Sequence, residues 1–164
     1  HRVGVDVMQV ALPHFEESSA SFCRTMSSSM SRSEREWVAQ GASEADVLSR
    51  LYDVWTYKEA LTKNMGLGLG YDFARIDLRF GRDVRLAMDG RAVDTYRFRE
   101  LALPCGASSR APGSRVAIAL GPRDAWEAPM SKQAVPAQQA MDEGWLRMWT
   151  YDAWLDYAWA MSGV

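Results

Sequence analysis

The stretch that decides the fold is SEADVLSRLYDVWTYKEALTKNMGLGLG, residues 43–70. Apolar residues recur along it at helical spacing, and Ser43, three residues before Asp46, is typical of a helix N-cap. The glycines at positions 66, 68 and 70 end the helix and form a loop that can approach another backbone closely. These signals predict one long helix that begins after Ser43 and ends at Gly66.

The apolar face of this helix contains a carboxylate. The stripe consists of Leu48, Leu51, Tyr52 and Trp55, and the next position at helical spacing is Glu59. A carboxylate on an inward face costs free energy unless a nearby charge compensates it, and Lys63 follows one helical turn later. An exposed Glu–Lys pair at this spacing is also a common stabilising feature of solvated helices. Both interpretations stay open on spacing alone.

A second carboxylate lies upstream, in a predicted strand. Apolar residues alternate from Val3 to Val7, which predicts a strand from about residue 2 to residue 10 that stops near Pro13. Asp6 lies in this strand and could meet Glu59 at a hard cation such as Mg²⁺, which prefers oxygen ligands. Lys63 would then help to neutralise a pyrophosphate. An aspartate near a strand end also commonly caps a turn, so Asp6 by itself is a weak signal.

The second half of the chain predicts a sheet followed by a helix. Strand-like runs cover residues 74–80, 84–88, 96–103 and 116–120, and Asp89-Gly90 is a hairpin signal. A turn is expected at 108–112, irregular structure at 121–136, and a helix at 137–161 with Trp145, Trp149 and Trp154 packed inward. The predicted fold class is α+β, a small antiparallel sheet packed on a long helix.

Composition limits the classes of function. The chain has 164 residues and predicts a single domain, 1–164. A net charge of -2 argues against nucleic-acid binding, and the sequence contains no uncharged apolar run long enough to span a membrane. Its two cysteines show no ligand spacing with its two histidines, so neither a zinc site nor a disulfide framework is expected. The cytoplasm is the expected compartment.

Two motifs taken together resemble a known family. Gly4-Val5-Asp6, followed downstream by Trp55-x-x-Lys58-Glu59-Ala60-x-x-Lys63, is similar to the paired signature of the 4′-phosphopantetheinyl transferase superfamily. The continuation Gly66-Leu67-Gly68-Leu69 resembles the glycine-rich segment of the Sfp-type and eukaryotic members. The motifs cover the first half of the chain, and the run 116–120 is similar to the family's closing strand.

The resemblance implies a magnesium-dependent transfer of the 4′-phosphopantetheine arm of coenzyme A to a serine of an apo acyl or peptidyl carrier protein. It assigns Asp6 and Glu59 to the metal, Glu59 also to general-base catalysis, and Lys63 to the coenzyme A phosphates with a catalytic role. It also assigns Lys58 to cofactor binding. Many bacterial members carry a second acid where this chain has Met8, so a water is expected to replace that ligand.

Sfp-type enzymes are pseudo-dimers of two similar halves, and the resemblance places this chain at the second half of a longer chain. The first half holds much of the coenzyme A nucleotide in that family. We therefore expect either a separate N-terminal half or self-association to complete the enzyme. The alternative is a non-catalytic, carrier-protein-binding or structural remnant of the fold.

Overall fold

The computed structural model describes residues 2–81, 84–103, 113–123, 135–144 and 146. In chain order the elements are β1 (Arg2–Gln9), α1 (Ser19–Thr25), the 3-10 turn η1 (Ser27–Ser29), α2 (Arg32–Ala39), α3 (Glu44–Met65), the 3-10 turns η2 (Gly68–Gly70) and η3 (Phe73–Arg75), β2 (Ile76–Arg79), β3 (Arg85–Met88), β4 (Arg91–Val93), β5 (Arg97–Leu103), β6 (Ser114–Gly121), β7 (Val135–Pro136) and α4 (Ala137–Asp142).

Helix α3 has 22 residues and the limits that its sequence signals predict. Ser43 is the N-cap, and its side chain accepts a hydrogen bond of 3.2 Å from the backbone N–H of Asp46. Gly66 ends the helix with a φ of 75°, a left-handed conformation that favours glycine. The predicted start and end of the helix are therefore confirmed. Within the described residues, no helix combines the length and the apolar character that crossing a membrane would need.

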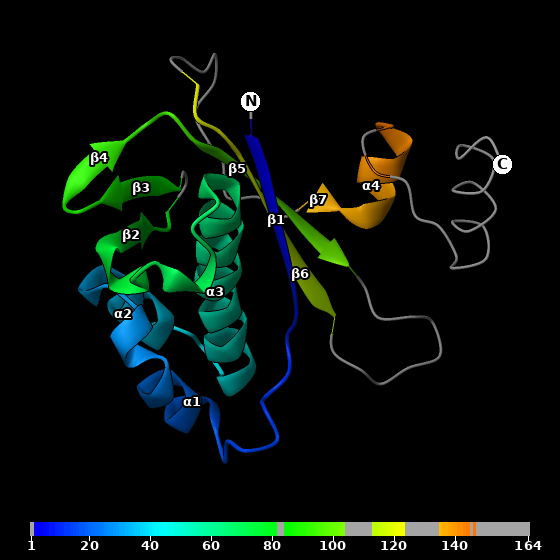
Figure 1. Cartoon of the computed structure of the whole chain (residues 1–164). Coiled ribbons are helices and arrows are strands. Elements are labelled where there is room, and N and C mark those ends of the chain that lie inside the picture. Colours follow the sequence, from blue (N-terminus) through cyan, green and yellow to red (C-terminus); the bar gives the residue numbers. More distant parts are fainter. Residues whose placement is uncertain (1, 82–83, 104–112, 124–134, 145, 147–164) are drawn as a thin grey trace, which may run out of the picture.

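Two separate sheets lie on either side of α3 (Figure 1). The larger has the strand order β1-β6-β5-β7, in which β1, β6 and β5 pair antiparallel and β7 pairs parallel to β5. The smaller sheet, β2-β3-β4, is antiparallel and lies with α1 and α2 on the opposite side of α3. Helix α4 packs on the far face of the larger sheet, where Ala140 joins Leu101 and Val116 in a small core.

The sequence predicted one small antiparallel sheet, whereas the structure has two sheets. The α+β class and the packing on a long helix are confirmed. From Leu51 to Asn64 every residue of α3 except Trp55 and Lys63 is buried. A helix buried around its whole circumference needs cover on more than one side. Its core accordingly combines Ile76, Leu78 and Leu86 of the smaller sheet with Ala117 and Ala119 of the larger one.

The smaller sheet confirms the predicted hairpin at Asp89-Gly90. Both residues have positive φ angles, 51° and 74°, and the pair Met88 and Arg91 closes the turn between β3 and β4. The predicted helix at 137–161 begins correctly at Ala137, and α4 ends at Asp142, where Gly144 follows with a φ of 78°. The part of this prediction at residues 147–161 lies outside the described residues. The predicted turn at 108–112 and the three tryptophans Trp145, Trp149 and Trp154 lie outside the described residues.

Strand β1 buries its small and polar residues instead of its valines. Gly4 and Asp6 face α3 and are buried, whereas Val3, Val5 and Val7 point away from the helix and are between 47% and 58% exposed. The alternating valines that predicted the strand therefore lie on the face of β1 that points away from α3. This orientation places the Asp6 carboxylate against the helix that carries Glu59.

The backbones of α3 and β1 lie very close together at Gly4. A Cβ at this position would overlap the backbone carbonyl oxygen of Ala60 and the amide nitrogen of Asn64. We expect Gly4→Ala to lower the free energy of unfolding by about 3 kcal/mol or more, because overlap with backbone forces the strand away from the helix. Urea denaturation measures this change. Gly70→Ala is the matched control, since nothing lies within 4 Å of a Cβ there, and equal stability of the two variants would contradict the close contact.

Candidate active site

The crossing of β1 and α3 brings together two buried carboxylates and one ammonium group. Asp6 lies in the middle of β1, and Glu59 lies on α3 one turn before Lys63. Asp6 and Glu59 are each only 7% exposed, although both are acidic. The strand thus contributes one acid and the helix contributes an acid and a base.

Lys63 compensates part of this buried charge. Its Nζ donates a hydrogen bond of 2.7 Å to Oδ1 of Asp6, and its side chain remains 45% exposed while that of Asp6 is 8% exposed. The second carboxylate oxygen of Asp6, Oδ2, is buried and has no hydrogen-bond partner. Burying a carboxylate oxygen without a hydrogen-bond partner costs free energy. The position of Oδ2 therefore indicates a site for a further positive group.

Glu59 titrates in an environment that opposes its ionisation. Burial raises the pKa of its carboxyl above the ordinary value, and the negative charge of Asp6 raises it further. The positive charge of Lys63 lowers the same pKa, but it is the smaller effect. Two carboxylates against one ammonium leave a deficit of positive charge, which a divalent cation would correct.

The donor set fits Mg²⁺ better than a transition metal. Within the described ranges no group of three or more His, Cys, Asp or Glu side chains could hold a metal ion. Mg²⁺ is usually bound through one or two carboxylates and completes its shell with water and substrate phosphates, so Asp6 and Glu59 suffice for it. Met8, two residues after Asp6, packs instead against the core beneath α1 and α2. Its side chain supplies no oxygen ligand.

Lys58 does not lie in this site. Its Nζ is 2.6 Å from Oε2 of Glu34 and donates to the backbone carbonyl oxygens of Ser29 and Phe73 at 2.9 Å and 2.8 Å. Three acceptors match the three N–H donors of an ammonium group. The side chain is 1% exposed, so the structure separates Lys58 from the Asp6–Glu59 pair and occupies its donors within the protein.

No role was predicted from the sequence for Glu34, the partner of Lys58. It is fully buried, and besides Lys58 it accepts from the backbone N–H groups of Ser31 and Leu78 at 2.7 Å and 2.8 Å. One carboxylate therefore joins α2, α3 and β2. The pattern Ser31-x-x-Glu34 is a capping box and could have predicted the bond to Ser31, but no local signal points to Lys58.

A second buried polar cluster lies nearer the start of α3. The hydroxyl of Tyr57 donates to Oε2 of Glu100 at 3.0 Å, while Nε of Arg115 lies 3.4 Å from Oδ1 of Asp53 and 3.8 Å from Oε1 of Glu100. Burial, and after it the charge of Glu100, raises the pKa of Tyr57 well above its ordinary value. This cluster ties α3 to β5 and β6 and holds no residue of the Asp6–Glu59 pair.

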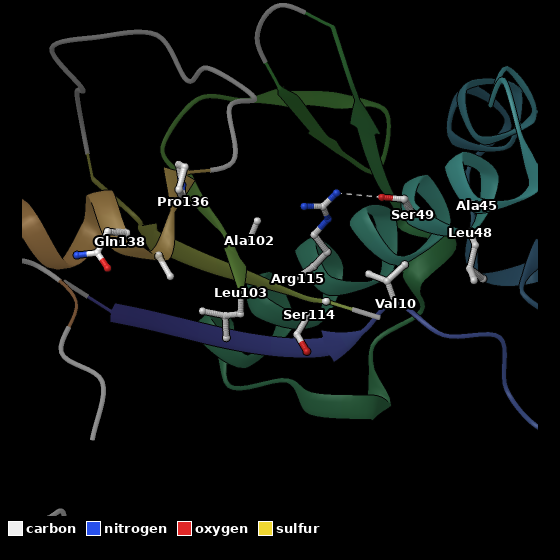
Figure 2. A pocket seen from close by; sticks show the side chains of 12 residues that line it. Val10, Ala45, Leu48, Ser49, Ala102, Leu103, Ser114, Arg115, Pro136 and Gln138 are labelled. Carbon is white, nitrogen blue, oxygen red and sulfur yellow. Dashed lines mark hydrogen bonds between the residues drawn. The ribbon is translucent and has the colours of Figure 1, made fainter. Parts of the chain in front are cut away.

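The structure also contains a cavity of about 660 Å³ near the start of α3 (Figure 2). Apolar side chains, among them Val10, Leu48, Leu103 and Pro136, form most of its wall. Arg115 lies on the wall and donates to the Ser49 hydroxyl at 3.1 Å. Asp6, Glu59 and Lys63 are not among the lining residues, so the cavity is distinct from the carboxylate site.

Comparison with known protein families places this chain in a known class of transferases. The chain belongs to the 4′-phosphopantetheinyl transferase superfamily, whose family model matches residues 2–118. That match includes β1, α3 and all three residues of the Asp6–Glu59–Lys63 site.

Individual relatives agree with the family. The chain is 37% identical over 103 residues to 4′-phosphopantetheinyl transferase pptA of Paxillus involutus, covering 61% of this chain and 39% of the relative. It is 32% identical over 104 residues to a phosphopantetheinyl transferase of Thraustochytrium sp., covering 59% of this chain and 36% of the relative. The chain therefore spans less than two fifths of the length of either curated relative. A solved ACPS–CoA complex of Chronobacterium ammoniagenes aligns with 18% identity and a TM-score of 0.48, covering 74% of this chain and 97% of that one.

Proposed function

We propose that this chain carries the metal and phosphate end of a holo-carrier-protein synthase. In this reaction a serine hydroxyl of an apo acyl or peptidyl carrier protein attacks the phosphorus of coenzyme A that bears the pantetheine arm. The P–O bond to the adenosine side breaks, and adenosine 3′,5′-bisphosphate leaves. The observation that carries the proposal is the convergence of Asp6, Glu59 and Lys63, with Oδ2 of Asp6 buried and unpartnered.

Each residue has a separate task in the proposed reaction. Asp6 and Glu59 would hold Mg²⁺, which supplies positive charge to the pyrophosphate and to its leaving oxygen. Glu59 accepts the proton of the serine hydroxyl, directly or through a water. Lys63, whose side chain is 45% exposed, reaches the phosphate oxygens from the solvent side.

The proposal includes a partner that completes the coenzyme A site. We infer that either an N-terminal half or a second copy of this chain provides the contacts to the nucleotide. Val3, Val5 and Val7 form an exposed apolar row on β1 that offers a surface for such packing. A cytoplasmic location, where coenzyme A and carrier proteins meet, is part of the same proposal.

The test is a mass measurement on the carrier. The chain, alone and with its N-terminal half, is incubated with Mg²⁺, coenzyme A and an apo carrier protein, and the carrier is then weighed. We expect the carrier to gain one phosphopantetheine arm, and EDTA or replacement of the carrier serine by alanine to prevent the gain. If the completed protein adds no arm, the enzyme reading is overturned. The alternative, a non-catalytic, carrier-protein-binding or structural remnant of the fold, then replaces it.

A further inference from the structure

Lys63 holds one of the two carboxylate oxygens of Asp6, the acid that would also bind a metal ion. Its ammonium is hydrogen-bonded to Oδ1 at 2.7 Å, while Oδ2 of the same carboxylate remains without a partner. We propose that Lys63 is an exchangeable counter-ion: it neutralises Asp6 in the metal-free protein and leaves when Mg²⁺ binds, which frees its ammonium for an anionic substrate. This inference rests on the proposed function and concerns the order of events at that site.

The charges of the site make the metal-free state depend on Lys63. Asp6 is only 8% exposed in its side chain, so its carboxylate has lost most of its hydration. An isolated buried carboxylate is strongly disfavoured, and the neighbouring carboxylate of Glu59, which is equally buried, adds repulsion. Lys63 is the cation that meets this need, because it donates directly to Asp6.

The same charges make Lys63 and Mg²⁺ competitors. Mg²⁺ approaches carboxylate oxygens to roughly 2.0–2.1 Å and demands a nearly ideal shell. An ammonium on Oδ1 of Asp6 lies beside the unpartnered Oδ2 of the same carboxylate, and two positive groups at one carboxylate repel each other. Binding of the divalent ion therefore removes the attraction that holds Lys63 on Asp6.

The position of Lys63 on the helix allows it to leave. It is the one exposed residue of α3 between Leu51 and Asn64, and nearly half of its side chain already contacts solvent. Lys58, by contrast, is held by three acceptors and has no exposed surface from which to move. Of the two motif lysines, only Lys63 is therefore free to change partners.

The experiment compares metal affinity and the environment of Lys63 in the same protein. Mn²⁺ binding to the chain is titrated by EPR for the wild type, Lys63→Gln and Arg2→Gln, with Asp6→Asn as the variant that lacks a metal ligand. Arg2→Gln is the matched control, because it removes a positive charge from the same strand. The guanidinium of Arg2 donates to the carbonyl oxygen of Met65 and not to Asp6. We expect Lys63→Gln to bind Mn²⁺ about fivefold more tightly than the wild type, because the metal no longer has to displace one partly exposed ion pair. Arg2→Gln should bind Mn²⁺ as the wild type does.

A second readout follows the lysine itself. The sequence contains only three lysines, so ¹³Cε-lysine labelling gives three signals, and the Lys63→Gln spectrum identifies the signal of Lys63. We expect Mg²⁺ to shift the signal of Lys63 and to leave that of Lys58 unchanged. Equal metal affinity of the wild type and Lys63→Gln, or an unmoved Lys63 signal at saturating Mg²⁺, overturns the exchange while the metal site stands. If even the wild type binds no metal, the metal site fails and the exchange fails with it.

Discussion

Lys58→Met should lower the free energy of unfolding by about 3–5 kcal/mol, the range for removing one partner of a buried ion pair. The side chains of Lys58 and Glu34 are 1% and 0% exposed, so the variant leaves a fully buried carboxylate without its counter-charge. It also leaves the carbonyl oxygens of Ser29 and Phe73 without their ammonium donor. Urea denaturation followed by circular dichroism measures the loss.

A double variant separates this structural role from a role in binding coenzyme A. Glu34→Gln removes the orphaned charge and keeps one oxygen as an acceptor, so it should recover part of the stability lost by Lys58→Met. We expect the folded fraction of Lys58→Met to bind coenzyme A as the wild type does. A variant of wild-type stability with much weaker coenzyme A binding would instead support the cofactor role that the family resemblance implied for Lys58.

Glu59→Gln should reduce phosphopantetheine transfer by about 10³-fold or more, since it removes both a metal ligand and the proton acceptor. The fold should survive, because glutamine has nearly the same shape and carries no charge to bury beside Asp6. Burial and Asp6 already raise the pKa of Glu59, so the loss of its charge should leave the melting temperature equal or higher. The carrier mass assay and a thermal denaturation curve measure the two effects.

Glu36→Gln is the control for this variant, because it changes an exposed carboxylate on α2 whose side chain is 59% exposed. It should alter neither transfer nor melting temperature. Retained transfer in Glu59→Gln would remove Glu59 from the proposed mechanism. Loss of transfer together with loss of fold would instead assign Glu59 a structural role.

Local signals predicted the helix that carries the site. Ser43 and Gly66 limit α3 because a side-chain cap and a left-handed residue act within a few positions along the chain. Helical spacing also predicted that Glu59 lies on the inward face, and it is buried. The convergence of Asp6 with Glu59 and Lys63 followed from the paired motifs, not from either motif alone.

Local signals could not predict which lysine of the motif enters the site. Lys58 and Lys63 are both cations on one helix, and their difference depends on Glu34, a residue distant in sequence that reaches Lys58 through the packing of α2. The valines of β1 posed the same problem. Their alternation with Gly4 and Asp6 is consistent with either face being buried, and the approach of α3 at Gly4 selects the polar one.

The sequence by itself determined a long capped helix, an α+β class and two motifs that together resemble the signature of one family of transferases. These depend on neighbours along the chain, where capping, spacing and turn geometry act over a few residues. Only the tertiary structure decided that two sheets enclose the helix, that Lys58 forms a buried ion pair with Glu34, and that Lys63 forms an ion pair with Asp6. Burial and charge pairing depend on segments far apart in the chain, so they exist only once the strand, the helices and both sheets have packed together.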